Sequence, residues 1–196
     1  QAARFAELVA APVARIIDPA VALGFDVINE PETLTADCAD LERSFQVPFV
    51  PWETIGSVID LTRRAIKAEH PSMLVTAGCT ITFLKKLWHA GATLDALDLH
   101  VYHADGGLPS RAALVEMIGD PAIETIPLIA GECGILGDAV TEESLANYIY
   151  NANKSDYQAV FLWKLFGVLV NANGLRPNLT HAGEAVRVAA ANVRAS

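Results

Sequence analysis

Apolar residues recur along the chain in two patterns, one at helical spacing and one in short continuous runs. The helical spacing predicts helices over residues 5–17, 52–68, 82–89, 109–118 and 180–193, and another that begins near residue 141. The short runs predict strands over residues 22–28, 73–76, 97–102, 126–130 and 159–163. Strands that are each followed by a helix indicate right-handed crossovers and a parallel sheet, so the sequence predicts an α/β fold.

One long stretch interrupts this alternation. Residues 32–51 lie between the first predicted strand and its helix, and they are longer than an ordinary connection. We therefore expect a functional loop here. The aromatic residues Phe45, Phe49 and Trp52 can either contact a ligand or pack the loop against the rest of the domain.

Composition and charge narrow the class of protein. Hydrophobic residues make up 52% of the 196 residues and charged residues only 19%, as in α/β domains whose strands are buried on both faces. The net charge is −9 and there is no stripe of Lys and Arg, which argues against a nucleic-acid partner. No apolar run reaches the length of about 18 residues that a membrane span requires, so we expect no membrane partner.

The cysteines indicate neither a disulfide framework nor a zinc site. Cys38, Cys79 and Cys133 are odd in number and far apart, and their spacing matches no zinc motif. We expect reduced thiols, which slightly favours the cytoplasm, although the sequence otherwise leaves the location open.

Several predicted strands end on polar or aromatic residues that an apolar core would not select. In parallel α/β folds the carboxyl ends of the strands form the active face, so these side chains are expected to lie together. They are Asn29, Glu30, His100, Tyr102, Glu132 and Trp163.

Two carboxylates on one face suit glycoside hydrolysis. One carboxyl group protonates the leaving oxygen, and the other attacks the anomeric carbon or activates water. Asn29, beside Glu30, is placed to bind a sugar 2-hydroxyl, and Tyr102 to donate a hydrogen bond to Glu132. Trp163 offers a flat apolar surface for a pyranose ring.

Four segments give this pattern a family resemblance. Gly24–Pro31, with its Asn-Glu-Pro, resembles the fourth barrel strand of glycoside hydrolase clan A, and Leu97–Tyr102, with its His-x-Tyr, resembles the sixth. Ile129–Gly134 resembles the seventh strand, which carries the nucleophile, and Phe161–Trp163 resembles the eighth. Their order and spacing are similar to those of the cellulase-like, family 5-like group, over most of the chain.

The resemblance implies a fold, an activity and roles for the candidate residues. Residues 1–196 would form a single partial TIM-type (β/α) barrel domain of about five parallel strands, equivalent to strands four to eight of a full barrel. The implied activity is retaining hydrolysis of O-linked β-glycosides, with Glu30 as acid/base and Glu132 as nucleophile. Asn29 would bind the 2-hydroxyl, and His100, Tyr102 and Trp163 would line the sugar subsite.

Other interpretations stay open. The first three strands, with the Arg and His that usually line the sugar subsite, have no counterpart here, so a carbohydrate-binding or vestigial barrel with little turnover is the alternative. His100 and Trp163 can also be core residues. His100, His103 and Asp105 together suggest a metal site, but without a second cluster we expect no metal, and we expect no cofactor.

A partial barrel leaves sheet edges and an inner face uncovered. Such edges recruit partners. Either the first part of a full barrel is missing from this chain, or the partial barrel pairs with a second copy, in which case we expect a symmetric homodimer through the open barrel.

Overall fold

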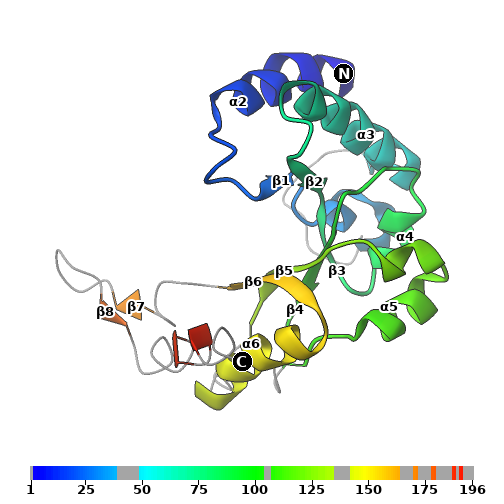
Figure 1. Cartoon of the computed structure of the whole chain (residues 1–196). Helices are drawn as coiled ribbons and strands as arrows, with labels where there is room; N and C mark the ends of the chain where they lie inside the picture. The colour runs from blue at the N-terminus through cyan, green and yellow to red at the C-terminus, as the bar shows by residue number, and fades with distance from the viewer. Residues whose placement is uncertain are drawn as a thin grey trace. The chain divides into compact units, whose positions relative to one another are not determined.

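The computed structural model describes residues 2–38, 49–103, 107–134 and 142–163, together with the short pairs 170–171, 178–179, 187–188 and 190–191. The chain divides into two compact units, residues 1–98 and 99–196. Strand β4 (Leu97–Val101) runs across the boundary between them. The predicted alternation of parallel strands and helices is confirmed in both units (Figure 1).

The first unit begins with a continuous helical segment that contains a π-helical turn. It consists of α1 (Ala2–Phe5), η1 (Ala6–Ala10) and α2 (Ala11–Ile16). The elements that follow are β1 (Gly24–Asp26), η2 (Pro31–Leu34), η3 (Ala36–Cys38), α3 (Trp52–Glu69), β2 (Leu74–Thr76), β3 (Gly78–Thr80) and α4 (Leu84–Trp88). The helix predicted over residues 5–17 therefore exists, and it starts earlier.

Strands β1 and β2 form a parallel pair in which Phe25 lies opposite Val75. Only Ala77 separates β2 from β3, and β3 does not belong to this pair. The predicted strand over residues 73–76 is therefore β2, and the short β3 that follows was not predicted. The two strands occupy one continuous extended run, so a pattern of apolar residues alone cannot separate them.

The core of the first unit lies between the N-terminal helices, α3 and β2. It contains Ala10, Ala14, Ile66, Met73 and Val75. The buried residues of α3 recur at helical spacing, which places them on one face; they are Ile55, Gly56, Ile59, Thr62 and Ile66. At Gly56 the helix approaches the chain after α4 so closely that an added Cβ would lie 2.0 Å from the carbonyl oxygen of Ala90.

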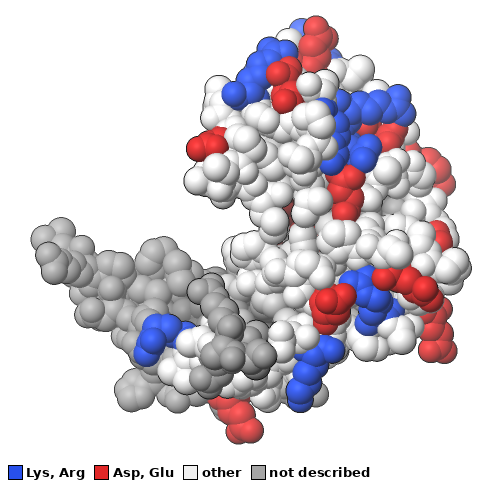
Figure 2. Space-filling view, viewed as in Figure 1, with Lys and Arg blue, Asp and Glu red and all other residues white. Residues whose placement is uncertain are grey.

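The carboxylate of Asp95 connects helix α3 to strand β2. Arg63 and Lys67 both contact the carboxylate of Asp95, at 2.7 and 2.9 Å, and the backbone N–H of Val75 donates to the same carboxylate. Burial opposes ionisation of Asp95, but the hydrogen bonds from Arg63 and Lys67 outweigh it and hold its pKa below the ordinary value. On the face of this unit seen in Figure 2, basic and acidic side chains lie interspersed.

The second unit contains the larger parallel sheet. After β4 come α5 (Arg111–Ile118), η4 (Pro121–Glu124), β5 (Leu128–Cys133), α6 (Glu142–Lys154) and β6 (Tyr157–Leu162). Strands β4, β5 and β6 are neighbours in that order, β5 and β6 run parallel, and α6 packs against β6. A short antiparallel pair, β7 (Val170–Asn171) and β8 (Asn178–Leu179), was not predicted. Of the helix predicted over 180–193, only residues 187, 188, 190 and 191 are described, and these are helical.

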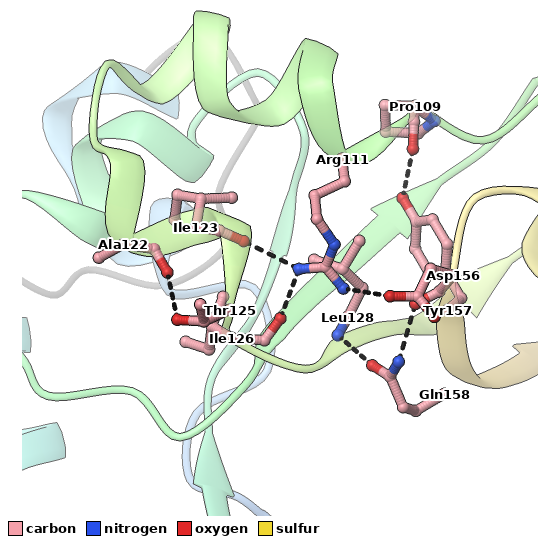
Figure 3. Close-up of polar contacts among 10 residues, drawn as sticks. All are labelled: Pro109, Arg111, Ala122, Ile123, Thr125, Ile126, Leu128, Asp156, Tyr157 and Gln158. Atoms are coloured by element: carbon pink, nitrogen blue, oxygen red, sulfur yellow. Dashed lines mark hydrogen bonds and ion pairs between the residues drawn. The ribbon is translucent and has the colours of Figure 1, made fainter.

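A guanidinium group organises the amino-terminal ends of β5 and β6 (Figure 3). Arg111 donates from Nη1 to the carbonyl oxygens of Ile123 and Ile126, at 2.8 and 2.7 Å, and pairs through Nη2 with Asp156. Beside it the Tyr157 hydroxyl donates to the carbonyl of Pro109 at 3.0 Å. These contacts lie at the starts of β5 and β6. In (β/α) barrels this end of the strands contributes to stability and the other end carries the active site.

In the described part of the chain, none of the helices has the length and apolar character needed to cross a membrane.

Candidate active site

Glu132 lies at an irregularity near the carboxyl end of β5. Ala130 pairs with Val160 and Cys133 pairs with Leu162, so β5 has one more residue than β6 in this interval. The extra residue makes a β-bulge, a feature that re-aims side chains beside active sites. The Glu132 side chain is only 18% exposed.

Two side chains from the end of β4 converge on one carboxylate oxygen. The Tyr102 hydroxyl donates to Oε2 of Glu132 at 2.5 Å, within the range of short hydrogen bonds to an ionised acceptor. Nδ1 of His100 lies 3.8 Å from the same oxygen. His100 is also buried, so it is both a core residue and a neighbour of the carboxylate. The structure thus brings together His100, Tyr102 and Glu132, as the strand ends predicted.

Trp163 directly follows β6 and is hydrogen-bonded to the last residue of β5. Its backbone N–H donates to the carbonyl of Cys133 at 2.7 Å, while its side chain is 55% exposed. At Gly134 an added Cβ would lie 2.5 Å from the carbonyl oxygen of Trp163, so only glycine fits between these two strand ends. The interpretation of Trp163 as a core residue is therefore wrong.

Glu30, in the first unit, occupies a backbone conformation that is uncommon for its type. Its φ of 47° and ψ of 59° lie in the left-handed region. The conformation is held because its N–H donates to Gly78 at 2.8 Å and its carbonyl accepts from the Thr33 hydroxyl at 2.7 Å. Strain of this kind concentrates at functional sites. The preceding Asn29 is exposed.

A second carboxylate, Glu32, anchors the segment that carries Glu30. It is 2% exposed; Oε1 accepts from the N–H of Thr80 at 2.9 Å, and Oε2 has no hydrogen-bond partner among the described residues. Burial and the nearby Glu32 raise the pKa of the Cys79 thiol. Glu30 and Glu32 line a cavity of about 370 Å³, together with Thr33, Asp37, Cys38, Thr80 and Phe83.

The described part of the long loop is fastened by Asp37. Its carboxylate accepts from Nζ of Lys86 at 2.6 Å and from Nε1 of Trp52 at 2.7 Å, which lowers its pKa. Trp52 also stacks against Phe83, with ring centroids 6.5 Å apart. Of the two alternatives for Trp52, the structure therefore shows packing. Phe45 lies outside the described residues, and Phe49 is half exposed.

The metal alternative, His100 with His103 and Asp105, is not decided by these contacts. Asp105 lies outside the described residues, and the backbone N–H of His103 donates to the hydroxyl of Tyr148 at 2.7 Å. Cys133, next to Glu132, is fully buried, and burial raises the pKa of its thiol to about 12. It fills core space, as expected for a cysteine of this kind.

Sequence reasoning missed Glu32 in the first unit, and Tyr148 and the bulge at Glu132 in the second. Glu32 falls in the stretch that the apolar pattern leaves irregular, and Tyr148 falls inside an ordinary amphipathic helix. A second carboxylate directly after Asn-Glu-Pro was the available signal for Glu32. No local signal separates Tyr148 from other tyrosines on a helix.

Neither a protein-family model nor a curated protein matches the sequence. Solved structures do match in fold. A β-1,4-mannanase from the common sea hare Aplysia kurodai is 16% identical with a TM-score of 0.61, over 98% of this chain and 59% of the mannanase. An endo-1,4-β-mannanase from Eisenia fetida is 20% identical with a TM-score of 0.57, over 91% of this chain and 56% of that one.

A third solved structure that is similar in fold is named as a xylanase. A GH10 xylanase from Bispora sp. MEY-1, solved with xylobiose, is 16% identical with a TM-score of 0.57, over 96% of this chain and 67% of the xylanase. This chain therefore spans a little more than half the length of the two mannanases. The resemblance predicted from the strand ends is confirmed at the level of the fold: the chain is a partial (β/α) barrel like those of clan A glycoside hydrolases.

Proposed function

We propose that this protein hydrolyses O-linked β-glycosides with retention of configuration, with Glu132 as nucleophile and Glu30 as acid/base. The observation that carries the proposal is the short hydrogen bond from Tyr102 to a largely buried carboxylate at the carboxyl end of a barrel strand. In (β/α) barrels this end of the strands carries the catalytic residues. Glu30 follows β1 at the corresponding end of its strand.

In the first step one oxygen of the Glu132 carboxylate attacks the anomeric carbon and forms an ester bond. The bond to the leaving oxygen breaks, and the Glu30 carboxyl group gives that oxygen its proton. Tyr102 donates to Oε2 of Glu132, so we assign Oε1 as the attacking oxygen. The hydrogen bond thus selects the attacking oxygen.

In the second step the Glu30 carboxylate takes a proton from water while the water oxygen attacks the same carbon. The ester bond breaks and Glu132 regains its charge. The Tyr102 hydroxyl stabilises that charge as it develops, because a hydrogen bond to an ionised carboxylate is stronger than one to an ester. The two carboxyl groups and water complete the cycle without a cofactor.

The substrate we propose is a β-linked saccharide. Similar barrels are named as β-1,4-mannanase and xylanase, which act on such chains. The exposed indole of Trp163 offers an apolar platform for a sugar ring, the buried His100 lines the same subsite, and Asn29 would hydrogen-bond the 2-hydroxyl. These three residues bind sugar, and the two glutamates perform the chemistry.

A panel of aryl β-glycosides tests the proposal. The wild type should release the phenol from at least one of the glucoside, mannoside, galactoside and xyloside. Glu132→Ala should abolish turnover, and Glu30→Ala should retain the first step when the leaving group is 2,4-dinitrophenol, which needs no proton. Azide should then restore turnover of Glu30→Ala with retained configuration.

The matched control is Glu124→Ala, which removes an exposed glutamate from η4. It should leave the rates unchanged. A wild type that binds oligosaccharides and hydrolyses none of the panel would contradict the proposed hydrolase and support the carbohydrate-binding alternative. A product of inverted configuration would contradict the double displacement.

We also propose that the chain corresponds to strands four to eight of a full barrel and that two copies pair through the open part. The N-terminal helices expose apolar side chains in the first unit, Leu8 at 59% and Ile16 at 83%, and β1 pairs only with β2 among the described strands. Exposed edges and apolar patches mark association sites. Light scattering should give twice the chain mass, and Leu8→Lys with Ile16→Lys should halve it. A wild-type monomer would refute the pairing.

A further inference from the structure

One buried hydroxyl connects the ends of two strands in the second unit. Tyr148 lies in α6 and is fully buried. Its hydroxyl accepts from the N–H of His103 at 2.7 Å. It lies 2.6 Å from the carbonyl oxygen of Gly134, 2.8 Å from that of His103 and 3.3 Å from that of Val101. A single side-chain atom therefore contacts the chain beyond β4 and the chain beyond β5.

The hydroxyl has one proton and can accept up to two hydrogen bonds. Gly134 is its nearest acceptor, and His103 supplies its donor, so the hydroxyl bridges an N–H on one segment and a carbonyl on the other. Among the described residues, the His103 N–H and the Gly134 carbonyl have no backbone hydrogen-bond partner. Burial makes the bridge more valuable, because an unpaired polar group in the core is costly.

The positions of these contacts relate them to the candidate site. Val101 and His103 flank Tyr102 in the chain, and Gly134 follows Glu132 by two residues. Tyr102 and Glu132 are the two partners of the 2.5 Å hydrogen bond. The bridge through Tyr148 thus holds the backbone next to both of them.

We propose that Tyr148 is a positioning residue that keeps the Tyr102 hydroxyl in hydrogen-bonding contact with Glu132. This inference rests on the proposed function, in which Glu132 is the nucleophile. Tyr148 touches neither substrate nor reacting atoms; it acts through the two backbone segments. A hydrogen bond weakens steeply when its geometry is disturbed, and displacement of a catalytic group by about 1 Å can cost on the order of 100-fold in rate.

A double-mutant cycle distinguishes this role from a contribution to stability alone. Tyr148→Phe should lower kcat on the dinitrophenyl glycoside by about tenfold, because part of the positioning is lost. Once Tyr102→Phe has removed the hydroxyl that Tyr148 positions, adding Tyr148→Phe should change kcat by less than about twofold. Independent effects, which multiply in the double variant, would overturn the inference.

A buried tyrosine elsewhere in the unit provides the matched control. Tyr157→Phe removes a hydroxyl that donates to the carbonyl of Pro109 at the start of β6, where Tyr157 pairs with Leu128, at the other end of β5 from Glu132. It should lower the unfolding temperature as Tyr148→Phe does and leave kcat unchanged. An equal loss of kcat in both variants would mean that Tyr148 acts through stability. Active-site titration with a 2-fluoroglycoside removes any unfolded fraction from the comparison.

Amide hydrogen exchange decides the question without activity. In the wild type the His103 amide should be protected like the amides of β4, although it lies beyond the strand, and Tyr148→Phe should release it. Free exchange of that amide in the wild type would overturn the inference, even if Tyr148→Phe does not fold. A wild type without activity would refute the proposed function, whereas a protected amide would still support the bridge.

Discussion

Replacing Tyr102 by Phe removes one hydroxyl and leaves the ring in place. The hydroxyl donates to Oε2 of Glu132 at 2.5 Å, and the carboxylate is 18% exposed, so little water is available to replace it. Hydrogen bonds to charged groups contribute about 1.5–3 kcal/mol. If that contribution is made as charge returns to Glu132, the variant should lose about 10- to 150-fold in the second step.

The two steps should respond differently. In the first step Glu132 starts with its charge and loses it. The hydrogen bond from Tyr102 therefore already stabilises the starting state, and part of its effect on the rate of this step cancels. In the second step the charge returns, and the variant has no donor for it. The glycosyl-enzyme should accumulate, so kcat and KM should fall together.

Pre-steady-state kinetics with a dinitrophenyl glycoside measures this directly. The variant should release a burst of dinitrophenol equal to the enzyme concentration, followed by slow turnover. His100 also lies beside Oε2, at 3.8 Å, so a His100→Asn variant with a smaller effect would show that the hydroxyl is the principal donor. Equal slowing of both steps, or a loss below about threefold, would refute the reasoning.

Three further predictions concern the scaffold. Asp95→Asn should lower the free energy of unfolding by about 2 kcal/mol at neutral pH. Because the pKa of Asp95 is lowered in the folded protein, this difference should be complete above the unfolded pKa of about 3.9 and vanish as the pH falls through the folded pKa. Urea titrations at several pH values measure the difference. Iodoacetamide at pH 8 should label Cys38 in the native protein but neither Cys79 nor Cys133, whose pKa values are raised by burial, and mass spectrometry would reveal a modified core thiol if this is wrong. Arg111→Met should cost about 2–3 kcal/mol, since two backbone carbonyls lose their donor, and a change under about 0.5 kcal/mol in thermal unfolding would contradict that role.

The sequence predicted those features that depend on a repeated local pattern. The helix over residues 52–68 is α3 almost to the residue, because its apolar positions recur on one face. Tyr102 and Glu132 were predicted to meet because parallel strands deliver their ends to one edge, and they do. The same rule predicted that Trp163 lies beside the end of β5, where its N–H donates to Cys133.

Other features depend on contacts between distant segments, which local patterns do not encode. The break at Ala77 arises because β2 pairs with β1 while β3 does not. The left-handed backbone of Glu30 is held by Gly78, and the hydroxyl of Tyr148 reaches the chain beyond β4 and β5. In each case the partner lies at least 14 residues away in the chain, so the feature becomes visible only in three dimensions.

The separation of the Glu30 and Glu132 carboxyl groups tests the central proposal most directly. A crystal structure of the protein with a bound 2-fluoroglycosyl group would give that distance and the site of attachment. The double displacement predicts about 5–5.5 Å, with the sugar esterified to Glu132. A separation of about 6.5–9.5 Å would indicate inversion through a water molecule, and a larger one, with no ester on Glu132, would show that these two residues do not act as a glycosidase pair.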